Sequence, residues 1–230
     1  MNIKKLLKVL AALFLIGVVA LTAVYFMNDE SLPKGKQGAE ADALATKMLK
    51  SLNYEAYKNT RFIEWSFRGK HFYKWDKQED IVEVSWDANK VTLHTKNPER
   101  SSVLVDGEKV ENKELLQNAI DYFNNDSFWL IAPYKVFESG IERRIVLHEG
   151  KEALLITYTT GGSTPGDSYL WILDDNGMPV SYKMWVSIIP TGGIEATWSD
   201  WTTTKSGALL PTKHEMPVGV LDMGDVKGYN

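Results

Sequence analysis

Cysteine is absent from this 230-residue chain. Its absence excludes disulfides, thiolate metal sites, cysteine nucleophiles and a lipid-modified N-terminal cysteine. The chain has four histidines, His71, His94, His148 and His214, but they are scattered and no His-Glu-x-x-His motif occurs. We therefore expect no metal site and no cofactor.

An excess of positive charge is also lacking. The formal net charge is −4, and it becomes −7 for residues 28–230, because residues 1–27 contain three lysines and no acid. Nucleic acids and anionic lipid headgroups select for basic surfaces. This balance argues against both, and we expect no nucleic-acid partner.

Recognisable catalytic motifs are missing too. The glycine-rich residues 161–166 lack the lysine and the following helix of a phosphate-binding loop, and no Gly-x-Ser-x-Gly elbow occurs. The sequence therefore predicts a protein that is not an enzyme.

The chain does contain one long apolar run, residues 9–27, which follows Lys4, Lys5 and Lys8 and precedes Asp29 and Glu30. A helix of nineteen residues would span roughly 28 Å, close to the ~30 Å hydrocarbon core of a bilayer. The lysines favour a cytoplasmic N-terminus, so the chain after residue 27 would cross the membrane.

Two outcomes for this run stay open. It is longer than the apolar region of an ordinary signal peptide, which favours a retained transmembrane anchor, but cleavage after Ala20 is also possible. We expect residues 1–27 to be a signal anchor or signal peptide, 28–38 a linker and 39–230 one domain. That domain would be anchored to the inner membrane in the periplasm, or released there after cleavage.

The body of the chain has the periodicity of an antiparallel sheet with a few helices. Apolar spacings of three and four predict helices over residues 39–52 and 113–124. Between and after them, alternating segments predict about eleven short strands, with hairpin turns at Asp106-Gly107 and Glu149-Gly150. The predicted fold class is α+β, mainly antiparallel β, with two or three helices covering a sheet that must curl.

This element order resembles the LolA/LolB superfamily of lipoprotein carriers over roughly residues 39–226. The resemblance also rests on the segments Phe62-Ile63-Glu64-Trp65, Val105-Asp106-Gly107-Glu108 and Leu170-Trp171-Ile172-Leu173-Asp174-Asp175-Asn176-Gly177-Met178-Pro179. It implies an incompletely closed antiparallel barrel whose concave apolar face is covered by helices. It also implies a periplasmic protein that carries lipoprotein acyl chains or senses envelope lipids.

The chain departs from that family at its N-terminus. The family's carrier is free after signal cleavage and its acceptor is held by a lipidated cysteine, whereas here an apolar run could replace both arrangements. This favours local lipid binding or sensing beside the inner membrane over shuttling. The expected partners are a lipid or lipoprotein acyl chain, the membrane and an envelope protein.

A curled sheet presents more inward apolar side chains than two or three helices can cover, which predicts an apolar concave groove. Each methylene buried there would contribute ~0.8 kcal/mol. The alternative is that the same side chains pack against the helices as core. The candidate ligand-binding residues are Ile63, Trp65, Phe67, Tyr73, Trp75, Val82, Val84, Trp86, Leu154, Ile156, Tyr158, Tyr169, Trp171 and Met184.

Three functions follow from these observations. The first is non-catalytic binding of lipid or acyl chains in the groove, which requires a space between sheet and helices. The second is an envelope interaction or sensing module that uses the sheet as a scaffold, with a filled interior and an exposed apolar patch. The third is a hydrolase, which needs a cleft with convergent polar groups.

Overall fold

The computed structural model describes residues 5, 10, 14, 15, 17, 29–160 and 164–230. The predicted membrane-spanning or signal helix, residues 1–27, falls almost entirely outside these residues. Within the described part of the chain, no helix is both long enough and apolar enough to cross a membrane.

The first sheet is a seven-stranded antiparallel meander with one returning strand. Its order is β16 (Lys227–Tyr229), β1 (Phe62–Phe67), β2 (His71–Asp76), β3 (Ile81–Trp86), β4 (Asn89–His94), β5 (Ser102–Val105) and β6 (Glu108–Val110). The alternating residues of β1 to β4 send one set of side chains to the core, as the sequence predicted. Asp106 and Gly107 both have positive φ, 50° and 83°, which is the backbone of the predicted tight hairpin.

The second sheet has five antiparallel strands in the order β11 (Ile194–Thr197), β10 (Pro179–Trp185), β9 (Ser168–Leu173), β8 (Lys151–Tyr158) and β7 (Ile141–His148). The predicted Glu149-Gly150 turn joins β7 to β8, again with two positive φ values. Both hairpin predictions are therefore confirmed.

Two short hairpins follow β11, and the second of them joins the sheets. They are β12 (Thr202–Thr203) with β13 (Leu209–Leu210), and β14 (Lys213–Met216) with β15 (Gly219–Asp222). At one end Ser66 N donates to Met223 O at 3.0 Å, and at the other Ser199 forms an antiparallel bridge with Lys213. The β14–β15 hairpin is thus hydrogen-bonded near β15 to β1 and near β14 to the residues that follow β11.

The described chain is therefore α+β with mainly antiparallel sheets, and it does not close into a barrel. The prediction of one continuous sheet of about eleven strands was wrong in detail. The described residues form sixteen strands in two larger sheets and two hairpins. The excess lies mainly in residues 194–222, which form five short strands, β11 to β15, because the chain turns between the sheets there.

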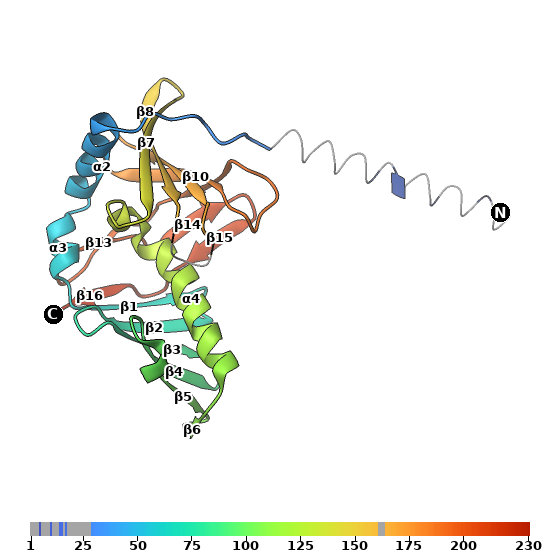
Figure 1. The fold of residues 1–230 in the computed structure, drawn as a ribbon, viewed down its shortest axis with the longest axis vertical. Helices are drawn as coiled ribbons and strands as arrows, with labels where there is room; N and C mark the ends of the chain where they lie inside the picture. Colours follow the sequence, from blue (N-terminus) through green and yellow to red (C-terminus); the bar gives the residue numbers. More distant parts are fainter. Residues whose placement is uncertain (1–4, 6–9, 11–13, 16, 18–28, 161–163) are drawn as a thin grey trace.

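Three α-helices occur among the described residues, α2 (Ala39–Ser51), α3 (Tyr54–Asn59) and α4 (Lys113–Ile131), with two 3₁₀-helices, η1 (Pro98–Arg100) and η2 (Ala132–Lys135). The helix predicted over 39–52 is confirmed, and α4 begins as predicted. The Asn112 side chain caps α4 by accepting from Glu114 N and Leu115 N at 3.1 Å. Figure 1 shows α4 lying across both sheets, with α2 and α3 along one side.

One hydrophobic core joins α2, α4 and the inner faces of both sheets. Phe123 of α4 packs on Trp75 of the first sheet, with ring centroids 5.3 Å apart, and Phe128 packs on Tyr169 of the second sheet at 4.5 Å. A smaller cluster of Val146, Ala153, Leu155 and Leu170 lies on the outer face of the second sheet with Trp185.

Substitution at Leu154 should test this core. Leu154 is fully buried, so Leu154→Ala should lower the free energy of unfolding by about 2–5 kcal/mol through lost contacts and a residual cavity. Leu147→Ala on the neighbouring strand is the matched control, because Leu147 is 74% exposed and should change stability by less than about 0.5 kcal/mol. Urea denaturation of both variants measures the difference, and equal losses would contradict the assignment.

Candidate functional site

A cleft opens where α4 runs into η2, between the two sheets. Its volume is about 420 Å³, within the range of roughly 300–1,000 Å³ that small-molecule pockets occupy. We call it the α4 cleft. It is lined by Trp75, Thr95, Phe123, Asn124, Asn125, Ser127, Phe128, Ile131, Ala132, Lys135, Glu138, Ser139, Ile141, Tyr158, Thr160, Thr164, Asp167 and Tyr169.

The apolar part of the α4 cleft is mostly aromatic. The rings of Phe128, Tyr158 and Tyr169 form a triangle, with centroid separations of 6.1 Å for Phe128 to Tyr158, 4.5 Å for Phe128 to Tyr169 and 5.7 Å for the two tyrosines, which meet edge to face. Rings in such tilted arrangements pack favourably and present a rigid, mostly apolar wall. The wall suits a hydrocarbon or another flat apolar group.

Two polar atoms in this wall have no hydrogen-bond partner among the described residues. They are Trp75 Nε1 and Tyr158 OH, both buried. Burial raises the pKa of Tyr158, so the phenol remains protonated at neutral pH. A buried donor without a partner costs free energy, but neither atom is exposed to the cleft, so a ligand oxygen could reach it only after the rings moved.

Three charged groups at the rim already have hydrogen-bond or ion-pair partners. Asp167, 5% exposed, accepts from Thr164 Oγ1 at 2.5 Å and from Ser187 N at 2.8 Å. Lys135 Nζ lies 3.3 Å from Glu138 Oε2. The rim therefore holds one ion pair and one carboxylate that accepts from neutral donors, and within the described part of the chain no histidine and acidic side chains gather to hold a metal ion.

The predicted groove residues divide between cleft and core. Trp75, Tyr158 and Tyr169 line the α4 cleft. Phe67 is half-buried and packs against the core. The other ten are buried core residues: Ile63, Trp65, Tyr73, Val82, Val84, Trp86, Leu154, Ile156, Trp171 and Met184. The structure thus brings three of the fourteen together in one cleft, because α4 and the aromatic rings fill the space beside the others. A ligand role for those others stays a prediction.

The α4 residues of the cleft were missed. Phe123 lies in the helix predicted over residues 113–124 but was not among the candidate ligand-binding residues, while Phe128 lies beyond residue 124, where the predicted helix ended. A prediction of the full length of α4 would have placed Phe128 on the same helix as Phe123. The last two turns of α4 carry Phe128 and Ile131 into the cleft.

A buried polar cluster joins α4 to β2, and sequence reasoning missed it as well. Asp126, 1% exposed, accepts through Oδ2 from Tyr73 OH and from His71 Nδ1 at 2.7 Å. The Tyr122 ring stacks on His71, with centroids 4.0 Å apart. These contacts form a network that ties α4 to β2.

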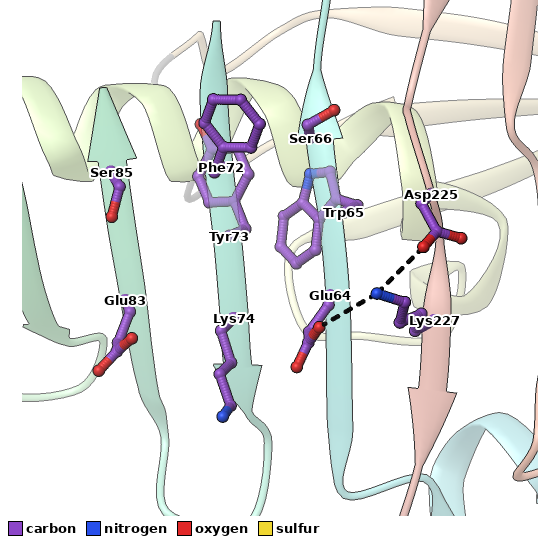
Figure 2. Close-up of a pocket in the computed structure, with 10 residues that line it drawn as sticks. All are labelled: Glu64, Trp65, Ser66, Phe72, Tyr73, Lys74, Glu83, Ser85, Asp225 and Lys227. Carbon is purple, nitrogen blue, oxygen red and sulfur yellow. Dashed lines mark ion pairs between the residues drawn. The ribbon is translucent and has the colours of Figure 1, made fainter. Parts of the chain in front are cut away.

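A second depression, of about 370 Å³, lies on the outer face of the first sheet (Figure 2). Charges alternate across its strands, and Lys227 Nζ lies 3.0 Å from Asp225 Oδ2 and 3.8 Å from Glu64 Oε2. Most of its charged side chains are paired, since Glu83 also pairs with Lys90, and it opens broadly to solvent. The α4 cleft is therefore the better candidate.

His214 occupies the core behind the α4 cleft. It is fully buried, its ring lies 4.8 Å from Trp198 and 5.4 Å from Trp129, and its Nδ1 donates to Thr197 O at 2.8 Å. Burial lowers the pKa of His214 to about 4.

Known proteins show little similarity to this chain. Neither protein-family models nor curated proteins match this sequence. Among solved structures, a DUF1329 family protein from Desulfovibrio piger is similar, with a TM-score of 0.43 and 8% identity over 82% of this chain and 92% of that one. This likeness is too low to carry a functional argument, and its description names no lipoprotein carrier.

The buried carboxylate predicts a specific cost for removing one donor. Tyr73→Phe takes a hydroxyl from Asp126 and should lower the free energy of unfolding by about 1.5–3 kcal/mol. Tyr229→Phe is the control, because its hydroxyl donates to the partly exposed Glu64. Denaturation curves should show the larger loss for Tyr73→Phe; a smaller loss than for Tyr229→Phe would contradict the network.

His214 predicts a pH dependence of stability. Between its pKa of about 4 in the folded chain and 6.5 in the unfolded chain, only the unfolded state binds the proton. Stability should therefore fall as pH drops through this window, by about 3 kcal/mol in total, and this contribution should level off below it. Denaturation at several pH values should show a shallower dependence for His214→Gln, while His148→Gln on the β7–β8 hairpin should keep it.

Proposed function

We propose that this chain is a non-catalytic envelope protein that binds a lipid, or the acyl chain of a lipoprotein, in the α4 cleft. The observation that carries the proposal is the cleft itself, a space of about 420 Å³ with an aromatic wall. The hydrocarbon of an acyl chain matches this wall.

The energetics support an apolar ligand. Burying ten methylenes would contribute roughly 8 kcal/mol before the entropy cost of binding. Chain length would then decide which lipid binds.

The same proposal places the protein at the inner membrane, with residues 9–27 as its anchor and the folded part in the periplasm, or free in the periplasm after cleavage behind Ala20. It needs no metal and no cofactor. Its support is the order of lysines, apolar run and acidic residues at the N-terminus.

A second candidate function is an interaction or sensing module built on the same sheets. It is favoured by the filled interior, since ten of the fourteen predicted groove residues are buried in the core. In this case an outer surface would contact an envelope protein and the α4 cleft would stay empty.

Two substitutions on one helix separate these functions. Asn124 and Gln117 are both exposed polar residues of α4, but only Asn124 lines the α4 cleft. Asn124→Trp should fill the cleft and weaken binding of a fluorescent fatty-acid ester by about tenfold or more, which corresponds to about 1.4 kcal/mol. Gln117→Trp should leave the affinity unchanged.

The measurement uses the full chain, purified from membranes in mild detergent, with native mass spectrometry for copurified lipid and titration for the probe. Copurified lipid that Asn124→Trp displaces would support the carrier function. An empty wild-type chain that also fails to take up the probe would contradict it and favour the interaction module.

A further inference from the structure

The chain that follows the apolar run is bound to the second sheet from its first described residues. Glu30 N donates to Gly192 O at 3.1 Å, Gly192 N donates to Asp29 Oδ1 at 2.8 Å, and Trp185 Nε1 donates to Glu30 O at 2.7 Å. Lys183 Nζ adds an ion pair with Glu30 Oε1 at 2.7 Å. The linker therefore begins as a fixed segment and not as a free tether.

The same segment is bound again at the opposite edge of the sheet. Lys36 pairs with Ile145 of β7 through two backbone hydrogen bonds, of 3.0 and 2.8 Å. Gly35 lies so close to this strand that a Cβ atom there would meet Arg144 Cβ at 2.6 Å. Residues 29–36 are thus held on both β10 and β7, as the blue segment in Figure 1 shows.

This attachment fixes where the apolar run must end. Residue 27 is two residues before Asp29, and two extended residues span at most about 7 Å. If the run spans a bilayer, the membrane surface lies close to the β10–β11 loop, residues 186–193, because Asp29 is bonded to Gly192 there.

The loop beside this point has the composition of a membrane contact. Residues 186–194 carry no charged side chain, and Ile188 is 74% exposed. The β14–β15 turn is similar, since residues 216–221 are uncharged, Val218 is 90% exposed and Val220 is 56% exposed. Exposed apolar groups gathered at one place indicate a contact surface.

The two uncharged segments lie at the same end of the molecule. β14 runs antiparallel to β11, since Lys213 pairs with Ser199 and Glu215 N donates to Thr197 Oγ1. The end of β14 therefore lies beside the start of β11 and the loop before it. Figure 1 shows the β10–β11 loop and the β14–β15 hairpin on the side where residue 29 begins.

We propose that Ile188, Val218 and Val220, which we call the apolar tip, contact the surface of the bilayer that holds residues 9–27. The inference rests on the membrane anchorage given under the proposed function and adds a fixed orientation to it. Because the tip is uncharged and the domain is acidic, the contact needs no anionic lipid and should be insensitive to salt.

This orientation also gives the α4 cleft a route to the bilayer. Asp167 at the rim of the cleft accepts from Ser187 N in the same loop. A tip seated among the headgroups would bring the rim beside the lipid, so an acyl chain could pass between bilayer and cleft over a short distance.

The absence of cysteine makes the test site-specific. The full chain is reconstituted in phosphatidylcholine vesicles with an environment-sensitive fluorophore on Ile188→Cys, Val218→Cys or Leu147→Cys. Leu147 is the matched control, because it is also 74% exposed but lies on β7, at the opposite edge of the sheet from β11. Quenching by lipids labelled near the headgroup reports contact with the bilayer.

The two tip positions should be quenched about twofold more strongly than Leu147, because interfacial apolar groups enter roughly 5–10 Å into the headgroup region. Equal quenching at the three positions would overturn the proposal. Blue-shifted but unquenched labels at the tip would also overturn it, since a second copy of the chain would then cover this surface.

Two further measurements distinguish a failure of this inference from a failure of the proposed function. Vesicle flotation of the same samples tests the anchor, and a chain that fails to float would overturn both anchor and tip contact. Fatty-acid ester binding in detergent tests the α4 cleft alone. A chain that binds the ester but shows no tip quenching would keep the cleft function and remove only the membrane contact.

Discussion

The packing of α4 across two separate sheets is the constraint on which the remaining structure depends. Phe123 packs the helix against the first sheet and Phe128 packs it against the second, so one rigid helix sets the distance between the two sheets. The Asp126 cluster fixes the helix further, because its carboxylate accepts from two side chains of β2. A buried carboxylate without those donors would be costly. The network therefore also determines which face of α4 meets the first sheet.

The α4 cleft is what this arrangement leaves unfilled. Up to Ile131 the helix supplies bulky side chains to the space between the sheets, but the chain then changes to η2 at Ala132 and turns away. A small side chain and a change of direction at that point leave the aromatic rings of β2, β8 and β9 facing open space. The cleft is thus a local consequence of where the helix ends. The broad hollow expected of a half-barrel is mostly filled by core.

The sequence predicted best what depends on neighbouring residues. The hairpins at Asp106-Gly107 and Glu149-Gly150 follow from local turn chemistry, and the starts of α2 and α4 follow from periodicity. The return of β16 to the edge of β1, and the hairpin that joins the sheets, depend on long-range pairing that no local pattern records. The site divides in the same way. Strand alternation found Trp75, Tyr158 and Tyr169, but only tertiary packing shows that Phe128 lies beside the latter two.

The contacts of the first residues after the apolar run bear on how the domain and its cleft would be oriented at a membrane. A flexible linker would let the domain sample every orientation above a membrane, and its surface would then carry no information about the bilayer. Here Glu30 is bonded through its amide, its carbonyl and its carboxylate, so a membrane anchor in the residues before it would also fix the orientation of the domain. The loop that receives it also donates to Asp167 at the rim of the cleft. Residues 29 and 30, the β10–β11 loop and the rim of the cleft are therefore linked by direct hydrogen bonds. If residues 9–27 hold the chain in a bilayer, as we propose, this coupling favours a lipid-binding protein that stays in place over one that shuttles.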